Sequence, residues 1–355
     1  MQHMAILNRQ LRFLESAIIQ ISSMSFSVIT GIIMGLYGWG YWSLVGMTVA
    51  FQIGYVTLSW FFCKWRPSMP VRRAGTRPLL RFGGHLTGFN IVNYFARNFD
   101  NILIGRFCGP TPLGFYSKAY SLMMLPITQI RTPLHKVSIP VLSRLQDDPA
   151  RFRRYYMKLL SLIAFVTMPL MTFMVISAEK VILMVLGDQW GGAVSIFRVL
   201  CVNAFIQPVA GTLGLVFISL GMSKRYFTIG SINSGIIIAS FALGLPWGAI
   251  GVSISYTIVT YFVLVPNLWY CYKGSPISIS DFFSAIYQPA IASGAMGASL
   301  LSVRPYLMAS GNVISLMIML LIGTAFYLFI LSILPGGYQF LKEFLSYRSL
   351  LFQKH

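Results

Sequence analysis

The sequence has 355 residues, of which 56% are hydrophobic and only 10% are charged, and its mean hydropathy is +0.71. A water-soluble domain of this length needs many more charged residues on its surface, so the composition excludes that class. The formal net charge is +19, and the distribution of the cations must decide between nucleic-acid binding and membrane topology.

Apolar residues gather into ten runs of 20 or more. An α-helix rises about 1.5 Å per residue and needs roughly 20 residues to cross a hydrocarbon core of ~30 Å. The sequence therefore predicts an all-α membrane protein with about ten transmembrane helices. The runs lie near residues 15–37, 41–63, 82–105, 113–142, 157–177, 193–219, 226–245, 248–270, 282–303 and 312–334.

The cations follow the topology of these runs. With the N-terminus placed in the cytoplasm, nineteen Lys and Arg residues lie in cytoplasmic segments, and four lie outside: Arg106, Lys118, Lys180 and Arg304. Cytoplasmic loops of membrane proteins carry such an excess of positive charge. We therefore expect a multi-pass protein of the bacterial inner membrane with both termini cytoplasmic, and no nucleic-acid partner.

The loops and motifs argue against an enzyme. The longest predicted external loop has about 16 residues, from Ser177 to Gly192, and no nucleophile, metalloprotease or phosphate-loop motif is present. The four cysteines have no CxxC spacing and no histidine cluster beside them, so we interpret them as apolar fillers. No cofactor and no metal site are expected.

Polar residues recur on one face of the third predicted helix. Asn90, Asn93, Arg97, Asp100 and Asn101 follow at three- and four-residue steps. Arg97 and Asp100 can pair, which reduces the cost of holding both charges at membrane depth. One interpretation is a polar contact between helices. The other is a water-filled cavity whose arginine binds an anionic head group such as phosphate.

Further bases accompany this stripe: Arg131, His135 and Lys136 in the fourth predicted helix and Arg198 in the sixth. One intramembrane acid, Asp100, thus faces the four intramembrane Lys and Arg residues. An anionic substrate would relieve that imbalance. Snorkelling to the membrane surface is the alternative for Lys136 and Arg198, which lie near predicted helix ends.

The fourth predicted helix carries Pro126, Pro133 and Pro140 at seven-residue intervals. Each proline removes a backbone hydrogen bond and can bend a helix. Pro126 and Pro133 are the candidate hinge positions of a segment that breaks or hinges near the midplane, as transporter helices do. A static kink fixed by neighbouring helices is the alternative.

A family resemblance is carried by residues 81–148 and a short segment after them. The segments that carry it read NFDNILIGR (98–106), LGFYSKAY (113–120), PVLSRLQDD (140–148) and LGDQW (186–190). They resemble Wzx-type polysaccharide exporters, in the colanic-acid-exporter branch of the multidrug/oligosaccharidyl-lipid/polysaccharide superfamily. The resemblance is looser elsewhere in the chain.

This resemblance implies a flippase for polysaccharide or lipopolysaccharide biosynthesis. Its substrate would be a polyprenyl-pyrophosphate-linked oligosaccharide, moved from the cytoplasmic to the periplasmic leaflet, and the pyrophosphate would be the anion for the buried cations. Membrane lipids and a coupling ion, H⁺ or Na⁺, are the other expected partners. The alternatives are a cation-coupled small-molecule exporter, which predicts an acid-rich site, and a membrane glycan polymerase or ligase, which predicts a long external loop.

The resemblance also implies a partial two-lobed transporter fold. The polar stripe lies on the seventh helix in the family but on the third here, so four N-terminal helices are expected to be missing. We therefore expect residues 1–78 to hold the last two helices of an incomplete first lobe and a basic cytoplasmic loop. Residues 79–272 would form a six-helix second lobe, and 273–355 a final helix pair with a cytoplasmic tail.

Overall fold

The computed structural model describes residues 3, 6–7, 12–63, 98–307, 312–335 and 337. The chain divides into two compact units, Met1–Gly84 and His85–His355, and each is described by itself. The predicted boundary between residues 78 and 79 lies outside the described residues. The predicted final part, 273–355, falls within the second unit.

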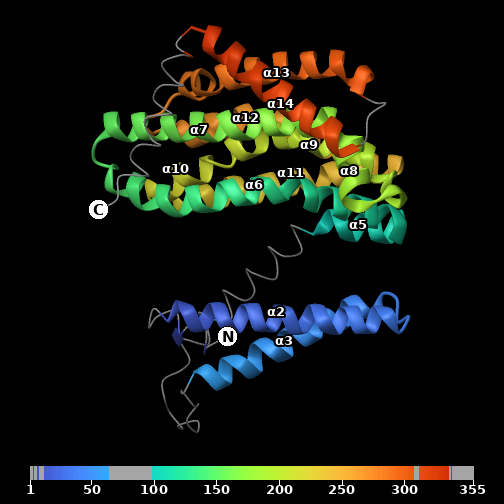
Figure 1. Ribbon diagram of the computed structural model, residues 1–355. Coiled ribbons are helices and arrows are strands. Elements are labelled where there is room, and N and C mark those ends of the chain that lie inside the picture. The colour runs from blue at the N-terminus through green and yellow to red at the C-terminus, as the bar shows by residue number, and fades with distance from the viewer. Residues whose placement is uncertain are drawn as a thin grey trace, which may run out of the picture. The chain divides into compact units, whose positions relative to one another are not determined.

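The first unit contains a helical hairpin of α2 (Phe13–Leu36) and α3 (Trp42–Phe62), which lie side by side (Figure 1). The short turn between them uses positive φ angles at Gly38 and Gly40, a conformation that glycine adopts without strain. The Ser27 hydroxyl donates a hydrogen bond of 2.7 Å to the Met47 carbonyl oxygen. This bond joins the two helices directly.

The described part of the second unit is helical and contains no strand. Its helices run alongside one another as a bundle (Figure 1). They are α5 (Phe99–Phe107), α6 (Pro110–Arg144), α7 (Pro149–Ile176), α8 (Ala178–Leu186), α9 (Ala193–Ala210), α10 (Leu213–Ser219), α11 (Ser223–Gly244), α12 (Gly248–Tyr272), α13 (Ile279–Leu307) and α14 (Asn312–Ile333).

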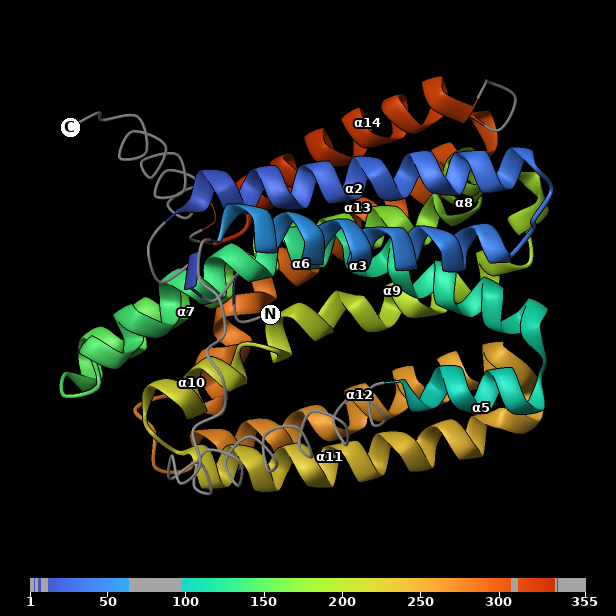
Figure 2. The same cartoon turned by 90° about the horizontal axis from the view of Figure 1, so that it is seen from below.

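Three apolar clusters form the interior of this unit, and the smallest joins α13 and α14 through side chains such as Met296 and Met319. One is built around α7, whose Leu160 and Ile163 are buried among side chains of α9, α12 and α13. Another joins α6 and α9, with Met123 and Phe197 fully buried. Seen from below, α5 lies beside α11 and α12 (Figure 2). Helix α5 also contacts α6, so it packs against three helices of the bundle.

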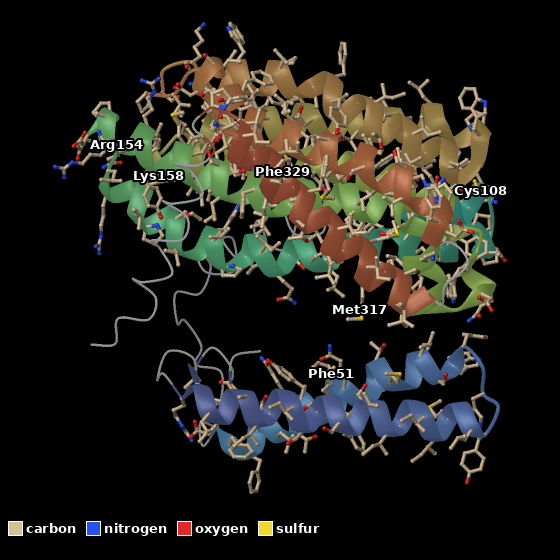
Figure 3. All side chains as sticks on the ribbon, turned by 45° about the horizontal axis from the view of Figure 1, so that its top comes forward. Phe51, Cys108, Arg154, Lys158, Met317 and Phe329 are labelled. Atoms are coloured by element: carbon tan, nitrogen blue, oxygen red, sulfur yellow. The ribbon has the colours of Figure 1, made fainter. Side chains whose placement is uncertain are left out.

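Six helical segments of the described part are long and apolar enough to cross a membrane, and the longest, Lys224–Tyr272, contains both α11 and α12. Large apolar side chains of α14, including Met317 and Phe329, point out from the helix (Figure 3), as expected of a surface that contacts lipid. The prediction of an all-α membrane protein is confirmed. The third predicted run, 82–105, is described only from Asn98 onward.

Two predicted segments differ in detail. The run 193–219 was expected to form one helix, but it forms α9 and α10, interrupted at Gly211 and Thr212. The Thr212 hydroxyl contacts the hydroxyl of Tyr156 at 2.8 Å, so α7 stabilises the interruption. The external segment from Ser177 to Gly192 was expected to be a loop, but it contains α8, because Val181 and Ile182 are buried against the bundle.

Candidate functional site

A cleft of about 640 Å³ lies within the second unit, between the described parts of five helices. Its volume is within the range of about 300–1,000 Å³ that is typical of ligand sites. Its lining mixes polar, aromatic and apolar side chains from α5, α6, α9, α11 and α12. These residues are Asn98, Asp100, Tyr120, Ser121, Met124, Arg131, Gln207, Ser234, Ile237, Phe241 and Tyr256.

Asp100 is the acid that lines this cleft, and it is only 6% exposed. The first turn of α5 positions it, where a carboxylate is favoured by the helix dipole. The Tyr116 hydroxyl donates to Oδ2 at 2.7 Å, and the Asn101 backbone N–H donates to Oδ1 at 2.8 Å. The carboxyl group is therefore held by neutral donors from α5 and α6. Its predicted pairing with Arg97 lies outside the described residues.

Arg131 is the cation that lines the same cleft. Its Nε donates to Nε2 of His135, one turn further along α6, in a long contact of 3.4 Å. It forms no ion pair with an acid of the described part of the chain. The guanidinium lies against Gly211, where an added Cβ would be 3.3 Å from the arginine Cζ. Glycine at the end of α9 thus leaves room for the arginine in the cleft.

Neutral hydrogen-bonding groups lie on the same lining. The Gln207 side chain donates from Nε2 to the Tyr256 hydroxyl at 3.3 Å, whereas its carbonyl Oε1 is buried without a hydrogen-bond partner in the described part. A buried acceptor left unpaired costs about 1–3 kcal/mol. Ser121 and Ser234 add hydroxyl groups to the lining. These groups can exchange hydrogen bonds with a ligand rich in hydroxyls or amides.

The predicted site residues fall into three groups. Asp100 and Arg131 are brought together at the cleft. Arg198 is half-buried on α9 and is not among the cleft-lining residues. Asn90, Asn93 and Arg97, together with the side chain of Lys136, lie outside the described part.

Pro126 and Pro133, the predicted hinge positions, lie inside α6. The helix runs continuously from Pro110 to Arg144 through both of them and through Pro140. The predicted break at these prolines is therefore not observed in α6. Bending about either proline during function stays a prediction.

Sequence reasoning did not identify Tyr120, Gln207, Ser234 and Tyr256 as cleft residues. Each lies within or beside an apolar run and carries no charge, so nothing in the pattern separates it from ordinary helix packing. The four cysteines are free, and the described residues contain no group of three or more His, Cys, Asp or Glu side chains that could hold a metal.

Comparisons with known proteins agree on one kind of protein. A family model described as "Polysaccharide biosynthesis protein" matches residues 1–195. The chain is 24% identical over 311 residues to the lipopolysaccharide biosynthesis protein WzxC of Escherichia coli (strain K12), covering 83% of this chain and 62% of that protein. It is 25% identical over 238 residues to the teichuronic acid biosynthesis protein TuaB of Bacillus subtilis (strain 168), covering 66% and 49%.

The fold is similar to a solved structure of the lipid II flippase MurJ in an inward closed conformation. The TM-score is 0.67, with 19% identity, and the match covers 93% of this chain and 67% of that one. At this identity the likeness concerns the fold. The present chain therefore spans between about half and two thirds of the length of the proteins it matches.

Proposed function

Because the chain belongs to the polysaccharide biosynthesis protein family, we propose that it moves a polyprenyl-pyrophosphate-linked oligosaccharide from the cytoplasmic to the external leaflet of the bacterial inner membrane. The names of WzxC and TuaB place those relatives in the biosynthesis of two different glycans, and MurJ is named a flippase of lipid II.

The cleft beside Arg131 is the observation that carries this proposal. A lipid-linked glycan presents a pyrophosphate next to sugar hydroxyls, and the cleft presents a guanidinium next to neutral donors and acceptors. The guanidinium is permanently charged and binds phosphate oxygens through a planar fork of N–H groups. The buried Oε1 of Gln207, which has no partner among the described residues, is an acceptor for a sugar hydroxyl. Transport is thus supported by a site that binds both parts of the head group.

We extend the substrate site to the other predicted residues at membrane depth. Asn90, Asn93, Arg97, Lys136 and Arg198 are proposed to contact the head group during its passage. The support is the charge imbalance of the sequence, because the predicted membrane spans hold one acid and four Lys and Arg residues. Arg131 remains the residue on which the proposal depends most, because its position in the cleft is described.

Coupling to an ion is proposed at Asp100. It is the acid of the cleft lining, and a carboxylate at membrane depth is a common site for H⁺ or Na⁺. A small-molecule exporter driven by cations would share this feature but would be expected to have more acids in its cleft. Transport by an Asp100→Asn variant should lose its dependence on an imposed Na⁺ or pH gradient. Unchanged gradient dependence would contradict the coupling role.

The proposed orientation places both termini in the cytoplasm. Arg154 and Lys158 lie at one end of the second unit and Cys108 lies at the other (Figure 3). The excess of cations in the predicted cytoplasmic segments supports placing the end with Arg154 in the cytoplasm. Tyr306 is 84% exposed near the end of α13 that is predicted to be external. A cysteine placed there should react with a membrane-impermeant thiol reagent in intact cells, whereas one at Arg154 should not. The reverse pattern would overturn the orientation.

Substitution of Arg131 tests the function. In cells that lack the gene, Arg131→Ala should reduce the appearance of lipid-linked glycan on the external leaflet by about tenfold or more, since a charge-assisted hydrogen bond contributes about 1.5–3 kcal/mol. Arg131→Lys, which keeps the charge but loses the fork, should give a partial loss.

Lys118→Ala is the matched control for this experiment. Lys118 lies on the same helix, is exposed and does not line the cleft, so export should be unchanged. Immunoblots of membrane fractions would confirm that all variants insert equally. Normal export by Arg131→Ala would show that the cleft does not bind the anion as proposed.

A further inference from the structure

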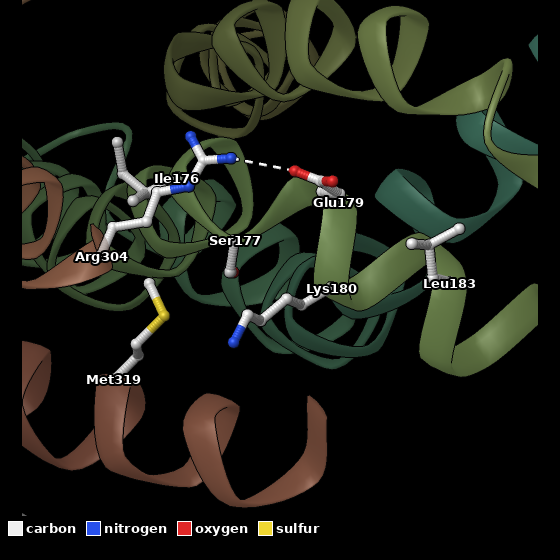
Figure 4. A pocket seen from close by; sticks show the side chains of 7 residues that line it. All are labelled: Ile176, Ser177, Glu179, Lys180, Leu183, Arg304 and Met319. Atoms are coloured by element: carbon white, nitrogen blue, oxygen red, sulfur yellow. Dashed lines mark hydrogen bonds and ion pairs between the residues drawn. The ribbon is translucent and has the colours of Figure 1, made fainter. Parts of the chain in front are cut away.

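A second pocket of about 180 Å³ lies away from the cleft and shares no lining residue with it. It is formed where α7 passes into α8, beside the last turns of α13 and the first turns of α14 (Figure 4). Its lining residues are Ile176, Ser177, Glu179, Lys180, Leu183, Arg304 and Met319. All of these belong to the unit His85–His355.

The pocket lining contains two cations, Lys180 and Arg304, and one acid, Glu179. Arg304 Nη2 and Glu179 Oε2 form an ion pair at 3.0 Å (Figure 4), and Lys180 Nζ donates to the Ser315 hydroxyl at 2.5 Å. The guanidinium has five N–H donors, and Glu179 is itself 47% exposed. The single ion pair with Glu179 therefore leaves N–H donors of the Arg304 guanidinium for a second anion.

Few cations are predicted on the external side of the membrane, so the presence of two of them in one pocket is informative. Only Arg106, Lys118, Lys180 and Arg304 are predicted to lie on the external side, and two of the four lie in this one pocket. They come from α8 and α13, which are far apart in the sequence. Interfacial cations that serve only topology are concentrated on the cytoplasmic side. A pair of cations gathered on the external side indicates a ligand.

The surroundings indicate an amphiphilic ligand. Ile176, Leu183 and Met319 form an apolar wall of the pocket. The adjoining first turns of α14 expose Val313, Ile314 and Met317 at the edge of the bundle. Such a surface is expected to contact acyl chains rather than water. An anionic group bound by Arg304 and Lys180 can therefore belong to a molecule whose tails lie along α14.

We propose that this pocket binds the phosphate of an anionic phospholipid from the external leaflet of the membrane. The phosphate would accept hydrogen bonds from the free donors of Arg304 and from Lys180, and the acyl chains would cover the exposed side chains of α14. The site lies where α13 and α14 meet α7 and α8, so a bound lipid would join the final helix pair to the rest of the unit. The proposal does not depend on transport.

Thermal unfolding of the purified full chain in a neutral detergent tests this site. Phosphatidylglycerol should raise Tm more than phosphatidylcholine with the same acyl chains, because a ligand that binds only the folded state stabilises it. Inorganic phosphate at matched concentration is the third arm. Arg304→Gln and Lys180→Gln should each weaken the response to phosphatidylglycerol, by about tenfold in the concentration required. Arg106→Gln, which removes an exposed cation at the same end, should respond as the unmodified chain does.

Glu179→Gln separates a lipid site from a purely structural ion pair. Loss of the competing carboxylate should strengthen the response to phosphatidylglycerol, opposite in sign to the effect of Arg304→Gln. If both variants lower the response equally, the pair is structural and the proposal is wrong. If inorganic phosphate gives the full response, the pocket binds free phosphate and the lipid assignment is overturned. Lys180→Gln keeps the Glu179–Arg304 pair, so it tests the site even if Arg304→Gln does not fold.

Discussion

Asp100 and Arg131 show how two charged residues can be kept at membrane depth by different means. Asp100 receives hydrogen bonds from the Tyr116 hydroxyl and from the backbone of Asn101, so its carboxyl is held by protein donors. Within the described part of the chain, Arg131 has one long contact with His135 and otherwise lines the cleft. Charged side chains are costly in this environment. Retention of an arginine with so few protein partners is consistent with an anionic ligand.

Substitution of Gly211 tests whether the position of the Arg131 guanidinium is required, without a change in charge. A leucine in its place would extend from a Cβ that is 3.3 Å from the Arg131 Cζ and 3.2 Å from the Gln207 backbone carbonyl oxygen, so we expect its side chain to displace the guanidinium. We expect Gly211→Leu to reduce export about as strongly as Arg131→Ala does.

Gly235→Leu is the matched control for Gly211→Leu. Gly235 lies on α11 with open space around its Cβ position, so this variant should export normally. Export should be assayed for both variants, and the amount of each variant in the membrane should be measured in parallel. Equal export by the two would mean that the guanidinium position is not required.

At the scale of elements, α7 and α13 are joined at the end opposite the pocket of Lys180 and Arg304. Arg153 binds Asp281 through two contacts, Nη2 to Oδ1 at 2.5 Å and Nε to Oδ2 at 2.8 Å. Asp281 also accepts from the Ser278 backbone N–H at 2.9 Å, and Ser278 Oγ accepts from the Asp281 N–H at 3.2 Å. This reciprocal pair caps the start of α13. One carboxylate thus both begins the helix and fastens it to α7.

The Arg153 contact predicts a dependence of stability on pH. Hydrogen bonding to Arg153 lowers the pKa of Asp281, which lies just outside the predicted span 282–303. The stabilisation is therefore present above the unfolded pKa of about 4 and is lost as the pH falls through the lower folded value. Asp281→Asn should be less stable than the unmodified chain at pH 7, by about 1 kcal/mol because Arg153 is half-exposed.

The difference in free energy of unfolding between the Asp281→Asn variant and the unmodified chain should decrease below pH 4. Unfolding of both proteins in detergent between pH 7 and pH 3 measures it. An Arg153→Gln variant should show the same difference at pH 7, and the double variant should lose no more than either single change. A difference that stays constant down to pH 3 would contradict the assignment.

The elements themselves were largely predictable from the sequence, because runs of about 20 apolar residues leave few alternatives to membrane helices. The interruption between α9 and α10 was not, since it depends on a contact of Thr212 with Tyr156 from α7. Helix α8 was missed because its nine residues are too short to form a run, and their burial depends on the tertiary fold.

Only the charged residues of the candidate site could be predicted from the sequence. Asp100 and Arg131 stood out because ionised groups are rare in apolar runs, and the structure places both at the cleft. Gln207 and Tyr256 come from helices that no local pattern links to α5 or α6. Gln207 and Tyr256 come together at the cleft because helices that are remote in the sequence pack against one another. Arg198 had the same sequence signal as Arg131 but does not line the cleft. It lies on α9, whose cleft-lining residue is Gln207, and residues on different faces of one helix point to different neighbours.

At the scale of the molecule, polar groups are gathered into a cleft inside a unit whose outer surface is apolar. That arrangement suits a substrate with a charged, hydroxyl-rich head and a long apolar tail, because the head is sheltered while the tail stays in lipid. The chain shares its fold with MurJ and belongs to the polysaccharide biosynthesis protein family. The chain spans 62% of WzxC and 49% of TuaB, so its transport activity must be measured on the chain itself.

The most direct measurement is transbilayer movement in reconstituted vesicles. The purified chain would be placed in vesicles that contain a polyprenyl-pyrophosphate-linked oligosaccharide, under an imposed Na⁺ or pH gradient. An impermeant glycan-cleaving enzyme added outside would report the accessible pool. We predict that the pool grows beyond the outer-leaflet fraction with the unmodified chain and not with Arg131→Ala. An accessible pool equal to that of protein-free vesicles under every gradient would contradict the account.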